Sequence, residues 1–139
     1  MRADIDTSGW NDIVVDVSKL ADVMEESQLR KALKEIGNCI MKYVKQYAPS
    51  PSDESHTHIK NDIKMHVKKS KQSKELYVSV LGGRDTGYKW NFINKGFTDR
   101  KGKFHEGNHF VDRAERASES EVNDIIDKYI KSALGEGKQ

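Results

Sequence analysis

The sequence is poor in the residues that cross-link small folds or interrupt them. Its 139 residues include one cysteine and two prolines. Cys39 has no partner for an intramolecular disulfide, which is typical of a protein made in a reducing cytoplasm. Long apolar runs are also missing: no window could span a bilayer, and Met1 to Asp6 lack the apolar run of a signal peptide. We therefore expect no membrane insertion.

A strong net charge is missing too. The formal net charge is +2, from 24 Lys and Arg against 22 Asp and Glu, which argues against a dedicated nucleic-acid binder. Positive charge is concentrated in residues 60–74, where six lysines accompany Asp62. Such a cluster could bind phosphates by releasing counterions, but no aromatic residue interleaves with it to stack on bases. We expect no specific nucleic-acid recognition, and a small DNA-binding protein stays as one alternative function.

Apolar spacing predicts two helices in the first third of the chain. Asp6 to Ser8 offer capping side chains, and apolar residues from Trp10 to Leu20 recur every three or four positions, as on one stripe of a short helix. A longer amphipathic helix carries its apolar face from Leu29 to Tyr47. It ends before Pro49, because the residue preceding a proline avoids helical geometry.

The residue pattern in the middle of the chain predicts a β-hairpin. Ile63 to Val67 and Leu76 to Val80 alternate in the period of half-buried strands, and residues 69–74 form the turn between them. The aromatic segment Tyr88 to Ile93 follows, and its spacing fits a helix or a strand equally.

A long helix closes the chain. Asn108 can cap it, the apolar residues from Phe110 to Ala133 keep approximately helical spacing, and Gly135 and Gly137 end it. Together these elements predict an α+β fold, in which N-terminal helices and a long C-terminal helix pack on a small antiparallel β-sheet.

The length and the lack of a compositional break predict one domain over residues 1–139. Two stretches within it are rich in polar residues, glycine or proline and have few apolar residues to bury. We expect mobile loops there, at about 50–60 and 97–109.

The segment His105-Glu106-Gly107-Asn108-His109 matches the zinc-peptidase pattern of two histidines four apart. A zinc hydrolase would place both histidines one helical turn apart on the metal, and Glu106 would activate the bound water. Gly107 and Asn108 are poor helix formers, and no third ligand stands at a recognisable spacing. A zinc hydrolase using His105, Glu106 and His109 stays as the second alternative. We expect no catalytic, cofactor or metal site.

Aromatic and basic side chains in polar surroundings are candidates for protein contacts. Phe97 and Phe104 stand among Lys, Arg, Asp and Gly residues, where apolar side chains often anchor a partner. Trp90 lies in the aromatic segment and can instead contribute to the core. The candidate interface residues are Arg84, Trp90, Phe97, Arg100, Lys101 and Phe104.

The order of these features resembles a known family. The helical N-terminal part ends in Tyr47-Ala48-Pro49, and the Lys-rich hairpin ends in Val78-Ser79-Val80-Leu81-Gly82. The aromatic segment runs to Gly96, and His109-Phe110-Val111-Asp112-Arg113-Ala114 opens the last helix. This order, over nearly the whole chain, is similar to that of the tail-completion, or head-tail joining, proteins of long-tailed bacteriophages, which include minor tail components.

The resemblance implies a non-enzymatic virion protein that completes the tail and joins it to the head. Such a protein is expected to assemble as a ring at the head-tail junction, with six copies as the expected number, and to reside in the host cytoplasm during assembly. The implied partners are further copies of the chain, the head connector or adaptor protein, and the tail tube or tail terminator protein. The loops at 50–60 and 97–109 would carry the interfaces.

Overall fold

The computed structural model describes residues 4–6, 12–16, 24–49, 58–72 and 74–135. In chain order the elements are β1 (Asp4–Asp6), β2 (Asp12–Asp16), α1 (Glu26–Tyr47), the 3-10 turn η2 (Ile59–Asn61), β3 (Ile63–Lys69), β4 (Leu76–Gly82), the 3-10 turn η3 (Gly87–Lys89), α2 (Trp90–Lys95), β5 (Gly96–Thr98), β6 (Phe104–Glu106) and α3 (Phe110–Ala133). The α+β prediction is confirmed.

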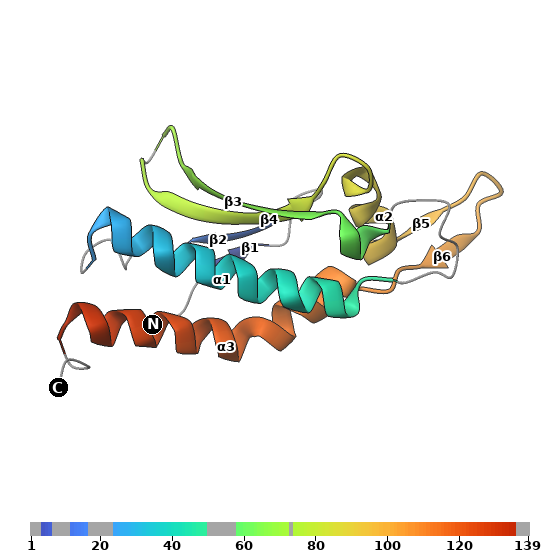
Figure 1. Ribbon diagram of the computed structural model, residues 1–139. Coiled ribbons are helices and arrows are strands. Elements are labelled where there is room, and N and C mark those ends of the chain that lie inside the picture. The colour runs from blue at the N-terminus through green and yellow to red at the C-terminus, as the bar shows by residue number, and fades with distance from the viewer. Residues whose placement is uncertain (1–3, 7–11, 17–23, 50–57, 73, 136–139) are drawn as a thin grey trace.

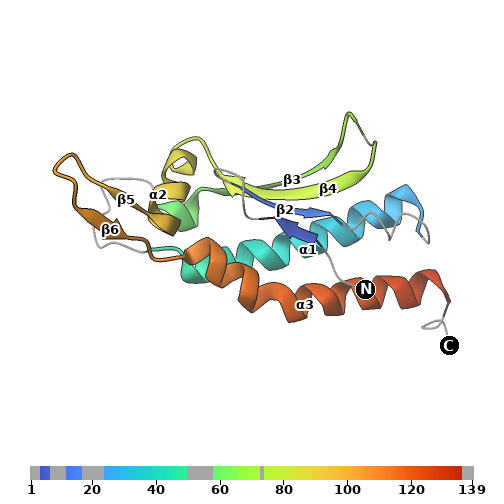
Figure 2. The ribbon, with the colours of Figure 1, turned by 180° about the vertical axis from the view of Figure 1, so that it is seen from behind.

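The elements form successive layers. Four antiparallel strands in the order β1-β2-β4-β3 make the main sheet, and β5 and β6 make a separate two-stranded sheet. Helix α1 lies between the main sheet and α3, as the two opposite views show (Figures 1 and 2). Helices α1 and α3 run in opposite directions along each other (Figure 1). The short helix α2 and the β5–β6 sheet lie beyond one end of this stack.

The core lies on both sides of α1, toward the main sheet and toward α3. Leu33, Ile36 and Ile40 on α1 are fully buried, as are Val78 and Val80 on β4. Gly37 marks the closest approach of helix and sheet, because a Cβ atom there would stand 2.6 Å from Cγ of Met65 and 2.9 Å from Cγ2 of Val78. A larger residue would therefore push the sheet away from the helix.

Polar side chains join α1 to α3 beside the apolar core. The Glu121 carboxylate accepts hydrogen bonds from the Cys39 thiol at 3.0 Å, the Lys42 ammonium at 2.9 Å and the Tyr43 hydroxyl at 3.2 Å. The hydrogen bond from Cys39, followed by that from Lys42, lowers the pKa of Glu121. One turn of α1 earlier, Glu35 accepts from Lys128 and Tyr129. These contacts specify the register of the two helices.

The prediction of a helix from Trp10 to Leu20 is wrong where the structure describes this stretch. Residues 12–16 form strand β2, in which Ile13 stands opposite Val80 of β4 and is fully buried. The run Ile13-Val14-Val15 is β-branched, and such residues fit a pleated sheet better than a helix. The edge of β4 supplied a pairing partner that the helical spacing of the apolar residues did not reveal. Residues 7–11 and 17–23 lie outside the described part.

The other elements follow the predictions closely. Helix α1 ends at Tyr47, before Pro49, the β3–β4 hairpin spans the predicted strands, and α3 spans Phe110 to Ala133. The predicted loop at 97–109 contains most of a two-stranded hairpin, and residues 50–57 of the other predicted loop lie outside the described part. No helix in the described ranges has both the length and the apolar character that a bilayer span requires.

Candidate docking site at one end of the molecule

Residues 88–106 form a distinct end of the molecule, which we call the hairpin end. It comprises α2, the β5–β6 hairpin and the flanking residues, and it lies opposite the C-terminal end of α3 (Figure 1). Within the hairpin, Phe97 stands opposite His105 and Thr98 opposite Phe104. The hairpin projects beyond the helices and the main sheet, so its side chains are well placed to meet another molecule.

Local hydrogen bonds shape the hairpin tip. One carboxylate oxygen of Asp99 accepts hydrogen bonds from the backbone N–H groups of Lys101 and Lys103, at 2.9 and 3.0 Å, and the other lies 2.9 Å from Nε2 of His105. The hydrogen bond with His105, followed by those from the backbone, lowers the pKa of Asp99. Gly102 has φ of 82°, a left-handed conformation that glycine adopts without strain. The tip is therefore structured by its own residues.

Exposed aromatic side chains gather at this end. Phe97 stacks on His105 with ring centroids 4.9 Å apart, and Phe92 meets the Phe97 ring edge to face at 6.4 Å. Tyr88, Phe92, Phe97 and Phe104 are between 47% and 63% exposed. Among the described residues, one other large hydrophobic side chain is comparably exposed. It is Leu134, which lies beyond the far end of α3. Apolar surface concentrated in this way makes this end a candidate interaction site.

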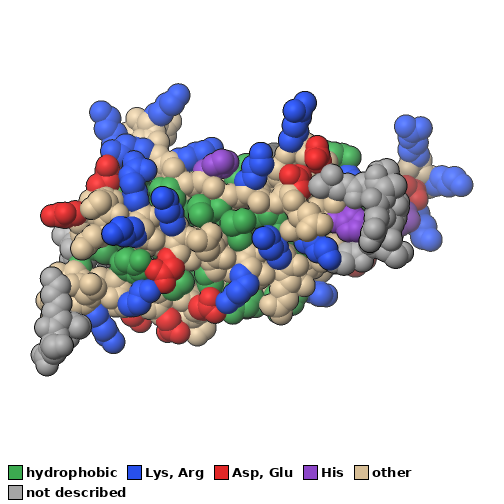
Figure 3. Space-filling view, viewed as in Figure 1, with side chains coloured by type: hydrophobic (Ala, Val, Ile, Leu, Met, Phe, Trp, Pro, Cys, Tyr) green, Lys and Arg blue, Asp and Glu red, His purple; other side chains and the backbone are tan. Residues whose placement is uncertain are grey.

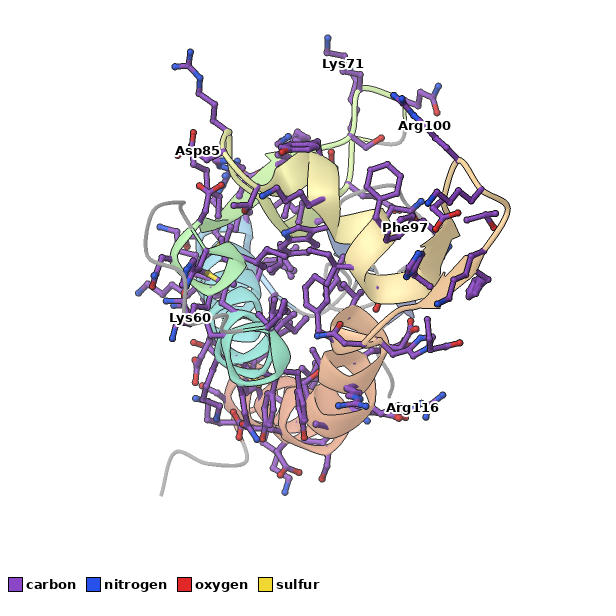
Figure 4. All side chains as sticks on the ribbon, turned by 90° about the vertical axis from the view of Figure 1, so that its right-hand side faces the viewer. Lys60, Lys71, Asp85, Phe97, Arg100 and Arg116 are labelled. Carbon is purple, nitrogen blue, oxygen red and sulfur yellow. The ribbon has the colours of Figure 1, made fainter. Side chains whose placement is uncertain are left out.

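Basic side chains surround the aromatic ones. Arg100, Lys101 and Lys103 are exposed, and among the described residues none of the three forms an ion pair. Lys and Arg side chains project at the hairpin end in the space-filling view, at its right-hand side (Figure 3). Arg100 lies at the tip of the hairpin, at the periphery of the end-on view (Figure 4). The two carboxylates of the hairpin, Asp99 and Glu106, both lie against histidines.

The geometry of a zinc peptidase is not formed at residues 105–109. His105 belongs to strand β6, whereas His109 is the N-cap residue of α3 with φ of 57°, so the two do not share a helical turn. Oε1 of Glu106 lies 2.7 Å from Nε2 of His109. Within the described ranges no three His, Cys, Asp or Glu side chains are grouped so that they could hold a metal ion.

The two central residues of this motif have structural roles. A Cβ atom on Gly107 would stand 2.2 Å from the backbone oxygen of Asn94, so glycine is required by the close approach of two backbone segments. The side-chain oxygen of Asn108 accepts a hydrogen bond from the N–H of Phe110 at 3.0 Å. Asn108 therefore serves the start of α3, as predicted, although the N-cap position itself is His109.

Asn94 joins the hairpin end to α3. Its side-chain oxygen accepts hydrogen bonds from the N–H groups of Val111 at 3.0 Å and Asp112 at 3.4 Å, so a residue of α2 caps the first turn of α3. His109 reinforces the junction, with Nε2 near Glu106 and Nδ1 3.4 Å from Asp112. The hydrogen bond with Glu106, followed by that with Asp112, raises the pKa of His109.

The structure brings together four of the six interface residues predicted from sequence, namely Phe97, Arg100, Lys101 and Phe104. Trp90 is instead 1% exposed and packs edge to face on Phe110 at 5.4 Å, so it belongs to the core. Arg84 is exposed, but its neighbour Asp85 lies across this end of the molecule from Phe97 and Arg100 (Figure 4).

Tyr88, Phe92 and Lys103 are exposed at the hairpin end but were not among the predicted interface residues. The spacing of 88–93 left helix and strand equally open, so it did not tell which side chains point outward. In a helix, Trp90 and Asn94 share the buried face and Phe92 lies away from it. That alternation of faces is the signal that would have identified Phe92.

A structured, exposed end that carries aromatic and basic side chains is a candidate surface for contact with other macromolecules. Comparison with protein families identifies the family to which the chain belongs. The model of the family described as "Bacteriophage HK97-gp10, putative tail-component" matches residues 12–96. The match covers more than half of the chain, so the chain belongs to this family of phage tail components, and the resemblance inferred from the sequence is confirmed.

The match begins at β2 and ends at the first residue of β5. Family membership makes the protein a structural component related to the phage tail, and hence a component of the virion that interacts with other phage structural proteins. Neither the comparison with curated proteins nor that with solved structures found a match.

Proposed function

We propose that this chain is a non-enzymatic tail-completion protein, which assembles as a ring and joins the finished tail to the head connector. The observation that carries the proposal, beyond family membership, is the hairpin end with its exposed aromatic and basic side chains. One domain over residues 1–139 would supply both the copy-to-copy contacts of the ring, with six copies expected, and contacts to neighbouring proteins of the tail and the connector.

The architecture suits a joining role. The hydrogen bonds of Asn94 to α3 connect the hairpin end to the core. A mechanical force that acts on the hairpin would therefore be transmitted to the long helices α1 and α3. A preformed surface also loses less conformational entropy on binding than a disordered one. Joining proteins need both properties, because they hold two large assemblies together through small contacts.

A non-enzymatic role is supported by the contacts of the histidines and carboxylates at 99–112. His105 lies against Asp99, and His109 lies against Glu106 and Asp112. Each group thus makes a contact that shapes the hairpin or the start of α3. A zinc hydrolase would instead need both histidines on one helical face.

Electron microscopy of a phage from which the gene has been deleted tests this proposal. We expect filled heads and separate tails to accumulate, and infectivity to return when the purified protein is added to the mixture. The same images should show a missing layer at the head-proximal end of the tails. Intact, infectious particles from the deleted phage would refute the proposal. Deletion that stopped tails from forming at all would also contradict it, because a completion protein acts on assembled tails.

A further inference from the structure

We infer that the hairpin end binds a protein other than this chain, at an apolar socket of that protein whose rim carries carboxylates. The inference rests on the proposed function and deepens it, because it names the surface used and the chemistry of the partner. Three observations support it: the exposed aromatic anchors, the basic side chains that form no ion pair among the described residues, and the poor fit of a second copy of the chain.

The anchors are Phe92, Phe97 and Phe104, each about half exposed. Phe92 and Phe97 meet edge to face, so together they offer one continuous apolar surface rather than isolated side chains. Aromatic side chains of this size bury a large apolar area when they enter a pocket of a partner, and such buried anchors contribute strongly to binding. The partner must therefore present apolar sockets to this surface.

The basic side chains of the hairpin indicate which charge the rim of the partner's socket carries. Arg100, Lys101 and Lys103 lie at the tip of the same hairpin, next to Phe104, and have no ion-pair partner among the described residues. The neighbouring carboxylates do not offset them through direct ion pairs, because Asp99 lies against His105 and Glu106 against His109. A partner with carboxylates around its socket would complement this arrangement and would discriminate against neutral or basic surfaces.

A second copy of the chain fits this surface poorly. Two hairpin ends in a symmetric contact would bring the tip cations of both copies together, and juxtaposed like charges disfavour association. A head-to-tail contact would need an exposed apolar surface elsewhere on the chain. Outside the hairpin end, the described residues offer Leu134 as a comparably exposed large hydrophobic side chain, without an aromatic cluster around it.

A nucleic acid fits the surface less well than a protein does. Bases stack on open aromatic faces, but His105 covers one face of Phe97 with its ring centroid 4.9 Å away, and Phe92 meets the same ring. The cations also sit on a turn of five residues, 99–103, rather than along a groove that could follow a phosphate backbone.

Binding of purified, fluorescently labelled protein to tailless heads and to headless tails of the same phage tests the inference. The anchor variant is Phe97→Ala/Phe104→Ala, and its control is Leu134→Ala, which removes an equally exposed apolar side chain at the other end. The charge variant is Arg100→Glu/Lys101→Glu, and its control is Lys68→Glu/Lys71→Glu on the β3–β4 hairpin, whose Lys71 lies apart from Phe97 in Figure 4.

We expect the anchor and charge variants each to bind heads or tails about tenfold more weakly, or worse, while both controls bind as the unaltered protein does. Raising the salt concentration should weaken the binding of the unaltered protein. The difference in affinity between the unaltered protein and the charge variant should therefore become smaller. The oligomeric state, followed by light scattering, should be the same for all variants, and thermal unfolding should show that each variant is still folded, since the altered side chains lie outside the buried core.

Equal binding by the variants and the unaltered protein would overturn the inference while leaving the proposed function intact. A variant that lost its self-association instead would show that the surface joins copies of the chain. Salt-sensitive binding to single-stranded DNA that the variants lacked would show that the surface binds nucleic acid. If the unaltered protein bound neither heads nor tails, the proposed function would fail together with the inference.

Discussion

The side-chain oxygen of Asn94 accepts a hydrogen bond from the backbone N–H of Val111 at 3.0 Å, although the two residues belong to different helices. Helix α3 thus receives part of its N-terminal cap from α2. The backbone oxygen of Asn94 also accepts from the N–H of His109 at 3.0 Å, so both the side chain and the backbone of this residue are hydrogen-bonded to the start of α3. Asn94, together with Trp90 packed on Phe110, therefore holds the candidate docking surface on the core.

The first prediction concerns this cap. Asn94→Ala should lower the free energy of unfolding by about 1–3 kcal/mol, because two N–H groups at the start of α3 lose their acceptor in a buried position. Chemical denaturation measures the change. The matched control is Asn91→Ala, on the same helix but half-buried, and it should change stability by less than about 0.5 kcal/mol. Equal losses in the two variants would contradict the capping role.

The second prediction concerns the close approach at Gly107. Gly107→Ala should destabilise the protein by about 1–3 kcal/mol, since its Cβ would meet the backbone of Asn94 and Gly96, which cannot swing aside as a side chain could. Gly102→Asn at the hairpin tip is the comparison. No atom lies within 4 Å of a Cβ there, and asparagine tolerates a left-handed conformation. If Gly107→Ala proved harmless in thermal unfolding, the described packing of α2 on the hairpin would be wrong.

The third prediction is a pH dependence. Glu106 and Asp112 raise the pKa of His109 above its ordinary value of 6.5, so protonated His109 stabilises the folded state. That stabilisation is fully present below the ordinary value and disappears as the pH rises through the raised one. The stability difference between the unaltered protein and His109→Gln should therefore be largest below the ordinary pKa of 6.5 and shrink as the pH rises through the raised pKa. A difference that stayed constant or grew over this range would count against the interaction, and NMR titration of the ring measures the pKa directly.

The fourth prediction concerns Cys39. Burial, followed by the hydrogen bond to Glu121, raises the pKa of this thiol from 9.0 to about 12. Near neutral pH its thiolate fraction is then about a thousandfold below that of a free cysteine, and the thiolate is the reactive form. Alkylation by iodoacetamide should be slower by at least about a hundredfold in the native protein than in urea. Rapid native alkylation would mean that the α1–α3 contact opens readily.

Much of the fold could be predicted because helical and strand periodicities were separate and long. The apolar faces of α1 and α3 recur over many turns, and β3 alternates between apolar and polar residues from Ile63 to Lys68. The secondary structure around Ile13 was predicted wrongly for the opposite reason. Its apolar residues are few and closely spaced, and their pairing with β4 is a contact between distant parts of the chain that no local pattern encodes.

The candidate site was predicted in part for similar reasons. Phe97 and Phe104 stood out because they are apolar residues in a polar segment. The short hairpin around them did not, since its strands have three residues each and depend on Asp99 bonding across its own turn. The histidines at 105 and 109 suggested zinc chemistry, whereas their position in the fold assigns them to contacts with Asp99, Glu106 and Asp112.

Cryo-electron microscopy of the head-tail junction of the intact phage is the decisive measurement for the joining role. We expect a ring of copies of this chain between the tail tube and the connector, in which the β5–β6 hairpin of each copy inserts its phenylalanines into a neighbouring protein of different sequence. A ring located at the far end of the tail, or a virion that lacks the chain, would show that the chain does not join tail to head.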